Sequence, residues 1–297
     1  MGLVLTLLLK FLSIYRNKSV AKQLALPEAH FSLDKIRPDF LFLNVVARSL
    51  VLWDEVEASS EWIEEQIPIF ISDFFTRLQR KLRGDTDIKE YRINVDSKAM
   101  KEAHAFIIAG ACFSLGLRFA GTGNEKARDA VFEKVVEFQK YRDDSNPFSM
   151  LIRPQRPIVE MCTGSAALSI MTMIMAGTGD LKILRLLKIL RWRCDDGVKY
   201  GSHMAINAAI GMLFLGGGTC TLGNEPEDIA ALLVALFPRF PMSTQDNQYH
   251  LKALRHITRN CEIVASLKST SEPWILPSTV QIKPNKVEPS LASSPIQ

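Results

Sequence analysis

The sequence predicts an all-α fold: an α-solenoid of helical hairpin repeats that ends in a disordered C-terminal tail. Three observations lead to this prediction. Apolar residues recur at helical spacing along most of the 297 residues. A glycine-rich motif returns at regular intervals, as in repeat proteins. The last residues, from about 266 onward, are rich in Pro, Ser, Thr and Lys and show no periodicity.

The glycine-rich motif appears three times in the second half of the chain. It reads AGTGN, AGTGD and, in a degraded copy, GGGT, at Ala120–Asn124, Ala176–Asp180 and Gly216–Thr219. The corresponding glycines, Gly121, Gly177 and Gly217, are 56 and 40 residues apart. The longer interval fits an insertion at 142–157, which is rich in Pro, Asp and Asn. Without it, one period of about 40 residues remains, within the range of solenoid repeats.

Each unit has the same internal order. An uncharged run of small and apolar residues comes first, at 107–117, 162–175 and 204–215. The glycine turn follows. An amphipathic segment then ends the unit, at 126–140, 181–191 and 227–237. A helix that is apolar all round must be buried, and one with a polar face lies outside. Each unit is therefore predicted to be a hairpin of an inner and an outer helix.

Two sets of small residues have distinct predicted roles. Glycine takes the positive φ that ends a helix without Cβ strain. The predicted turn residues are Gly121, Gly123, Gly177, Gly179, Gly216, Gly217 and Gly218. Small side chains are expected to let neighbouring inner helices approach closely, at Gly110, Ala111, Gly164, Ala166, Ala208 and Gly211.

The remainder of the chain completes three predicted regions. Residues 1–100 are expected to hold early repeat helices and a polar insert, residues 101–260 the three hairpin repeats, and residues 261–297 the disordered tail. In the first region, Arg37–Trp53 has the apolar spacing of one helix, with Pro38 suited to its first turn. A second helical segment, from about Ser60 to Leu82, should break at Pro68.

The units resemble the proteasome/cyclosome repeats, helical hairpins found in two large regulatory subunits of the proteasome and in the anaphase-promoting complex. The motif Ala-Gly-x-Gly-(Asn/Asp) carries this resemblance. Longer strings resemble the subunit 1 family of the anaphase-promoting complex: RPDFL from Arg37, LWD from Leu52, IAGACFSLG from Ile108, LFLGGG from Leu213 and DNQYHLKALRH from Asp246. The resemblance covers roughly residues 1–257, a small part of that long subunit. The chain is then expected to be a fragment, a truncated gene product or a short paralogue.

The resemblance implies a non-catalytic scaffold in a ubiquitin ligase that drives cell division. The implied partners are the other subunits of the complex: the cullin–RING module, the substrate-recognition subunits and the tetratricopeptide subunits. Neither cofactor nor metal is implied, and the implied location is the nucleus and cytoplasm. Because the same repeats occur in the proteasome, a docking platform for ubiquitin-like domains is the alternative function.

The residues themselves give no support to an enzyme or a metal site. His104, His203, His250 and His256 are scattered over different units, and the five Cys form no CxxC pair. The glycines at 216–218 lack the Gly-Lys-(Ser/Thr) ending of a phosphate loop. A net charge of +4 without dense Lys and Arg runs argues against nucleic acid.

A multi-pass membrane protein is the structural alternative. The stretches Met161–Gly179 and Tyr200–Asn224 contain no charged residue and reach about the length of a bilayer span. Their uninterrupted apolar parts are shorter, as expected of buried core helices. The apolar N-terminus, 1–15, is interrupted by Lys10 and lacks a basic leading region, which favours a core helix over a signal peptide.

One candidate partner-binding surface stands out. Lys182, Arg185, Lys188 and Arg191 recur every three residues along the outer segment of the second unit. An ordinary solvated helix face would look the same. The functional hypothesis is a docking surface for an acidic partner, because repeat scaffolds bind through such extended surfaces.

Overall fold

The computed structural model describes residues 18–33, 35–82, 97–141, 153–168, 173–193, 200–236, 245 and 267–269. Within them the chain is almost entirely helical, which confirms the predicted all-α class. The helices are α2 (Lys18–Gln23), α3 (His30–Leu33), α4 (Pro38–Val51), α5 (Ser60–Glu65), α6 (Ile69–Leu82), α7 (Ser97–Arg118), α8 (Glu125–Lys140), α10 (Arg156–Leu168), α11 (Leu181–Arg191), α12 (Tyr200–Leu213) and α13 (Pro226–Leu236). Two 3-10 turns, η1 (Trp53–Glu55) and η3 (Leu215–Gly218), and two short strands, β1 (Cys220–Leu222) and β2 (Leu267–Ser269), complete them.

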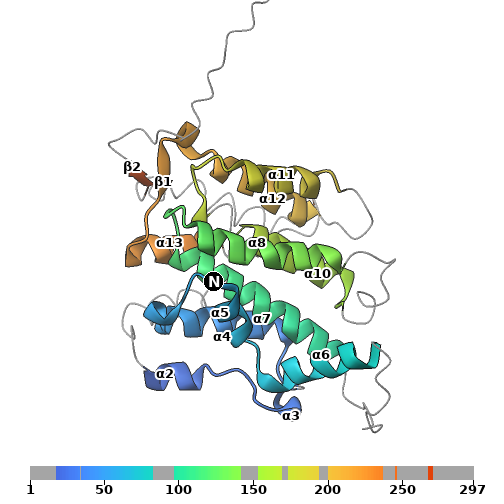
Figure 1. Cartoon of the computed structure of the whole chain (residues 1–297). Helices are drawn as coiled ribbons and strands as arrows, with labels where there is room; N and C mark the ends of the chain where they lie inside the picture. Colours follow the sequence, from blue (N-terminus) through green and yellow to red (C-terminus); the bar gives the residue numbers. More distant parts are fainter. Residues whose placement is uncertain are drawn as a thin grey trace, which may run out of the picture.

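The helices are stacked in layers along one axis (Figure 1). The inner helices α4, α7, α10 and α12 contact one another in chain order. The outer helices face outward: α8 contacts α10, the inner helix of the next unit, and α11 likewise contacts α12. Each outer helix thus packs against the following unit, so that neighbouring repeats share one continuous core.

Helices α4, α5 and α6 form where the sequence predicts helical segments. Pro38 occupies the first turn of α4, where its missing N–H costs nothing. The side chain of Ser59 caps α5 by accepting a hydrogen bond from the backbone N–H of Trp62. The predicted break at Pro68 separates α5 from α6. The predicted opening unit and polar insert lie mostly outside the described residues, at 1–17 and 83–96.

All seven predicted turn glycines adopt a positive φ, between 57° and 86°. The first turn also bonds to the second unit, since the N–H of Gly121 donates to the carbonyl of Met173 and that of Gly123 to Ile174. The second turn repeats the pattern one unit later. There the N–H of Gly177 donates to the carbonyl of Met212 and that of Gly179 to the carbonyl of Leu213, each at an N···O distance of 3.0 Å. The turns therefore join neighbouring units as well as ending helices.

Strand β1 explains why these turns need glycine for a second reason. A Cβ atom on Gly121 would lie 1.9 Å from the carbonyl oxygen of Leu222, and one on Gly177 would lie 2.0 Å from that of Cys220. The hydroxyl of Thr221 donates to the carbonyls of Gly121 and Ala176, at O···O distances of 3.1 and 3.2 Å. The strand thus lies directly across the first two turns, and only glycine leaves room for it.

The third unit departs from the predicted hairpin. After η3 and β1 the chain reaches α13, which packs against α7 of the first unit instead of pairing with α12 (Figure 1). The physical reason is β1, which runs back over the glycine turns and carries the next helix with it. Within the predicted disordered tail, 267–269 form β2, which pairs antiparallel with β1. The rest of the tail lies outside the described residues.

Small residues set the spacing of inner helices at some predicted positions only. A Cβ on Gly110 of α7 would lie 3.0 Å from the carbonyl oxygen of Phe42 and 3.2 Å from Cβ of Val45, both on α4. Gly164 of α10 would contact Ala205 at an ordinary 3.9 Å. Gly211 would meet nothing within 4 Å, so close packing does not explain the glycine there.

A pair of Gly→Ala substitutions tests this difference. Gly211→Ala is expected to stabilise the chain by about 0.5–1 kcal/mol, because alanine is the better helix former. Gly110→Ala gains the same propensity but forces α4 away, and is expected to destabilise by about 1–2 kcal/mol. Urea unfolding of both variants measures the two effects. Equal shifts of the same sign would contradict a close approach of α4 and α7 at Gly110.

Candidate partner-binding surface

Polar contacts connect the successive outer helices α5, α8 and α11. Between α5 and α8, the hydroxyl of Ser60 donates to Glu133, and the ammonium of Lys134 contacts Glu64 at 2.8 Å. Between α8 and α11, Arg128 pairs with Asp180 at 2.8 Å. These contacts fix the outer surface of the stack, on which any partner would dock.

The fifth residue of the glycine motif begins each outer helix. Asn124 caps α8 by accepting from the N–H of Ala127, and Asp180 caps α11 by accepting from the N–H groups of Lys182 and Ile183. The sequence signal was present, since Asn and Asp are preferred caps and stand directly before an amphipathic segment. Sequence reasoning used these residues only as part of the motif.

The four basic residues predicted as one surface do not behave alike. Lys182 lies 2.7 Å from Asp129 of α8, and its ammonium sits 4.6 Å from the ring centre of Phe132. Lys182 therefore joins two repeats. Arg185, Lys188 and Arg191 are exposed, and none forms an ion pair with a side chain in the described part of the chain.

Helical geometry explains the split. Three residues fall short of a full turn of about 3.6, so residues at a constant spacing of three drift around the helix. Lys182 thus points toward α8 and Arg191 toward the opposite flank. The middle of the exposed side is instead formed at 4-3-4 spacing by Leu181, Arg185, Lys188 and Trp192.

Sequence reasoning missed the apolar part of this surface. Leu181 is 65% exposed, Ile189 59% and Trp192 81%. The inward side of α11 is fully apolar, with Ile183, Leu186, Leu187 and Leu190 buried. The helix is therefore apolar on its core side and carries a mixed apolar and basic side outward. The 4-3-4 spacing was readable from the sequence and would have separated the two sides.

A second group of polar side chains surrounds the buried ammonium of Lys134, where α5 meets α8. Lys134 is buried and contacts both Glu64 and Glu137, and the hydroxyl of Tyr141 donates to Glu137 at 2.8 Å. Burial lowers the pKa of Lys134, but its hydrogen bond to Glu64 and the charge of Glu137 outweigh burial and raise it. The ammonium stays charged, so this cluster is a structural ion pair between units.

His104 packs beside this cluster and is held neutral. Its ring lies 4.3 Å from that of Phe75, centre to centre. Burial lowers the pKa of His104 to about 4, while Glu137 and Glu64 act in the opposite direction and Lys134 adds to the lowering. His203 lies on a different helix, α12, and His250 and His256 lie outside the described residues.

The lowered pKa predicts a loss of stability in mild acid. Between about pH 6.5 and 4 the unfolded chain binds a proton at this histidine and the folded chain does not, so stability falls as pH falls through that window. We expect His104 to account for about 2 kcal/mol, discounted because the ring is only partly buried. The comparison is His104→Gln against His203→Gln, unfolded in urea at pH 7 and pH 4.5. If His104→Gln lost as much stability between pH 7 and pH 4.5 as the unmodified chain, groups other than His104 would be responsible for the loss.

The described cysteines offer no nucleophile in the core. Burial raises the pKa of Cys112 to about 12 and raises that of Cys162 as well. Both thiols are fully buried and inert for that reason. Cys220 differs, because it is partly exposed on β1. Among the described residues, no group of His, Cys, Asp and Glu is arranged to hold a metal ion.

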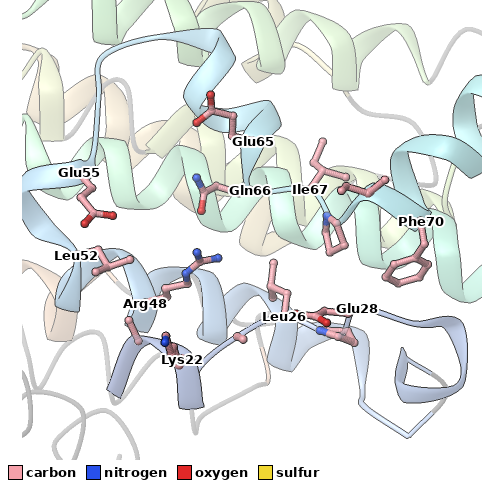
Figure 2. Close-up of a pocket in the computed structure, with 15 residues that line it drawn as sticks. Lys22, Leu26, Glu28, Arg48, Leu52, Glu55, Glu65, Gln66, Ile67 and Phe70 are labelled. Carbon is pink, nitrogen blue, oxygen red and sulfur yellow. The ribbon is translucent and has the colours of Figure 1, made fainter. Parts of the chain in front are cut away.

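A cleft of about 690 Å³ opens between α2, α4 and the α5–α6 junction. Figure 2 shows Lys22, Arg48 and Glu55 toward one end and Ile67 and Phe70 toward the other. The groups with shifted pKa values described above line other parts of the molecule. The cleft therefore presents mixed polar and apolar side chains without a catalytic arrangement among them.

The membrane alternative finds limited support. Among the described helices, α7 is the one with the length and hydropathy to span a bilayer, and 83% of its apolar window is buried inside the molecule. That burial is typical of a core helix. The uncharged stretch from Tyr200 yields α12, which at 14 residues is shorter than a span.

Comparison with known proteins gives one consistent answer. The family described as "APC1 fifth domain" matches residues 1–258. The chain is 38% identical over 242 residues to anaphase-promoting complex subunit 1 of Homo sapiens, 36% over 281 residues to that of Schizosaccharomyces pombe, and 35% over 265 residues to that of Arabidopsis thaliana. These matches cover 81%, 91% and 86% of the chain but only 12%, 18% and 15% of the relatives.

Proposed function

The chain belongs to the family of anaphase-promoting complex subunit 1, and we propose that it serves as a non-catalytic scaffold segment in that cell-cycle ubiquitin ligase. The observation that carries the proposal is the domain match over residues 1–258, most of the chain. A similar relative in Emericella nidulans is named "Negative regulator of mitosis", which agrees with a role in cell division.

The architecture supports a positioning role. Stacked repeats expose long, rigid outer surfaces, and the ion pairs between α5, α8 and α11 hold these surfaces in fixed register. No cluster of reactive side chains emerges from the described residues, and the buried thiols and His104 are held in their neutral forms. The chain thus offers surfaces for assembly, and chemistry would come from other subunits.

The proposed partners are the cullin–RING module, the substrate-recognition subunits and the tetratricopeptide subunits of the complex. The proposed location is the nucleus and cytoplasm, where such a complex would act. A docking platform for ubiquitin-like domains, as in the proteasome, is the other outcome that the experiment below distinguishes.

Native affinity purification of the tagged full chain, followed by mass spectrometry, tests the proposal. We expect the cullin and tetratricopeptide subunits to co-purify in comparable amounts. Gly177→Ala, whose Cβ would clash with the carbonyl oxygen of Cys220, provides a destabilised control that should lose these subunits. Gly217→Ala, whose Cβ would meet nothing within 4 Å, is the matched control that should keep them. Proteasomal ATPases in place of these subunits would support the alternative, and neither set would contradict both.

A further inference from the structure

We infer that the outward side of α11 binds a short acidic segment of a partner protein that carries bulky apolar side chains. This inference rests on the proposed scaffold function and names the chemistry of one of its partners. The surface consists of Leu181, Arg185, Lys188, Ile189 and Trp192, with Arg191 on its flank, and is called the α11 surface below.

The apolar side chains supply the first part of the argument. Burying a tryptophan side chain removes a large apolar area from water, which is favourable. Because Trp192 is 81% exposed, a partner that covers it would gain this free energy on binding. Ile189, one turn before Trp192 and 59% exposed, extends the same patch. Tryptophan is enriched among the residues that contribute most to binding at protein interfaces. Trp192 and Ile189 therefore form the apolar centre of the surface.

The charges supply the second part. Arg185 and Lys188 lie on the same side of α11 as Trp192, Arg191 lies on the flank, and the described part of the chain provides none of them with an ion-pair partner. Lys182, by contrast, is neutralised by Asp129 and belongs to the fold. A partner that covers Trp192 would lie along the side of the helix that carries Arg185 and Lys188, and carboxylates are the groups complementary to these cations.

The neighbouring helix limits the partner to a short segment. The side chain of Glu125 on α8 is 78% exposed, and Glu133 of the same helix is exposed as well. A long polyanion such as a nucleic acid would run from α11 onto these carboxylates and be repelled there. An acidic peptide segment of a few turns or less would remain on α11. The observations thus favour a peptide over a nucleic acid.

Binding of synthetic probes to the purified full chain tests the inference. The probes are fluorescent amphipathic peptides: one with Glu and two Leu on one side, one with Lys in place of Glu, and one with Ser in place of Leu. The Glu/Leu peptide is expected to bind best, and more tightly at low than at physiological salt. Trp192→Ala and Lys188→Glu should each weaken it about tenfold, with Lys188→Glu acting mainly on the association rate.

Matched variants and a charge swap make the test specific. Phe31→Ala removes another exposed aromatic ring, and Lys126→Glu reverses an exposed charge on α8; both should leave the affinity unchanged within about twofold. Lys188→Glu should gain affinity for the Lys peptide. Thermal unfolding confirms that each variant is folded, since all these side chains are exposed.

Three results would overturn the inference. The Ser peptide could bind as tightly as the Leu peptide with no effect of Trp192→Ala, which would show a bare charge effect. An oligonucleotide could bind more tightly than any peptide with the same dependence on Lys188, which would indicate a nucleic-acid surface. The third result is that none of the probes binds to the chain. Because the chain and probes are purified, each result is independent of whether the chain co-purifies with the cullin subunit.

Discussion

Gly177→Ala is expected to destabilise the chain by about 4 kcal/mol, whereas Gly217→Ala should cost about 1 kcal/mol. Both glycines have a positive φ, of 72° and 67°, so both alanines bear the cost of the left-handed conformation, about 1–2 kcal/mol. Only at Gly177 would the new Cβ lie 2.0 Å from a backbone carbonyl, that of Cys220. That atom cannot rotate away, so β1 must leave the turns, and the contacts of β1 are lost.

Urea unfolding followed by circular dichroism measures both variants. Gly121→Ala, with its Cβ 1.9 Å from the carbonyl of Leu222, serves as a second test and should resemble Gly177→Ala. If Gly177→Ala and Gly217→Ala lost equal stability, the strand would not be lying on the turns in solution.

Asp180→Ala is expected to cost about 3 kcal/mol, against about 1 kcal/mol for Asn124→Ala. The two residues occupy the same place in successive repeats, and each caps the outer helix that follows, worth about 1 kcal/mol. Asp180 additionally pairs with Arg128 of the preceding outer helix, and each of these two side chains is only 12% exposed. Removing the carboxylate leaves a mostly enclosed guanidinium, with Asp129 at 3.0 Å and Glu125 at 3.8 Å as its remaining ion-pair partners on α8.

Asp180→Asn separates the two contributions. It keeps the oxygen that accepts from the backbone of α11 but removes the negative charge. Asp180→Asn should therefore destabilise the chain by about 1–2 kcal/mol, less than Asp180→Ala. Chemical denaturation of the three variants gives the comparison. Equal losses for Asp180→Ala and Asn124→Ala would mean that the ion pair between repeats contributes nothing to stability.

The features that the sequence predicts correctly are local. A positive φ at Gly121 or Gly177 follows from the motif itself, because glycine is the residue that tolerates it. The break at Pro68 follows from the missing N–H, and the inner and outer helices follow from the distribution of charge along each segment.

The features that escaped prediction depend on contacts between distant residues. Thr221 bonds to Gly121 across 100 positions of sequence, and no spacing rule connects them. The packing of α13 on α7 follows from that contact and was therefore equally hidden. Lys134 meets Glu64 in the same way, 70 positions apart. Periodicity identifies the elements of a repeat, whereas the partner of each element is decided by the assembled stack.

The α11 surface lies between these cases. The sequence shows the basic residues, and helical geometry places Trp192 beside them. What it does not show is which apolar residues the next layer covers, and hence that Trp192 and Ile189 are left outside while Leu190 is buried. Likewise, Lys182 resembles the other three cations in the sequence, and only the structure shows that its ammonium lies 2.7 Å from the carboxylate of Asp129 in the preceding repeat.

Hydrogen exchange at the turn amides tests most directly the central claim that the glycine turns couple each repeat to the next. The amides of Gly121, Gly123, Gly177 and Gly179 donate to carbonyls of the following unit, whereas that of Gly217 bonds locally, to Phe214. If the repeats form one coupled stack, the four inter-unit amides should exchange only through global unfolding, and that of Gly217 much faster through local opening. Exchange of all five at the same fast rate, with the helices still protected, would contradict the claim.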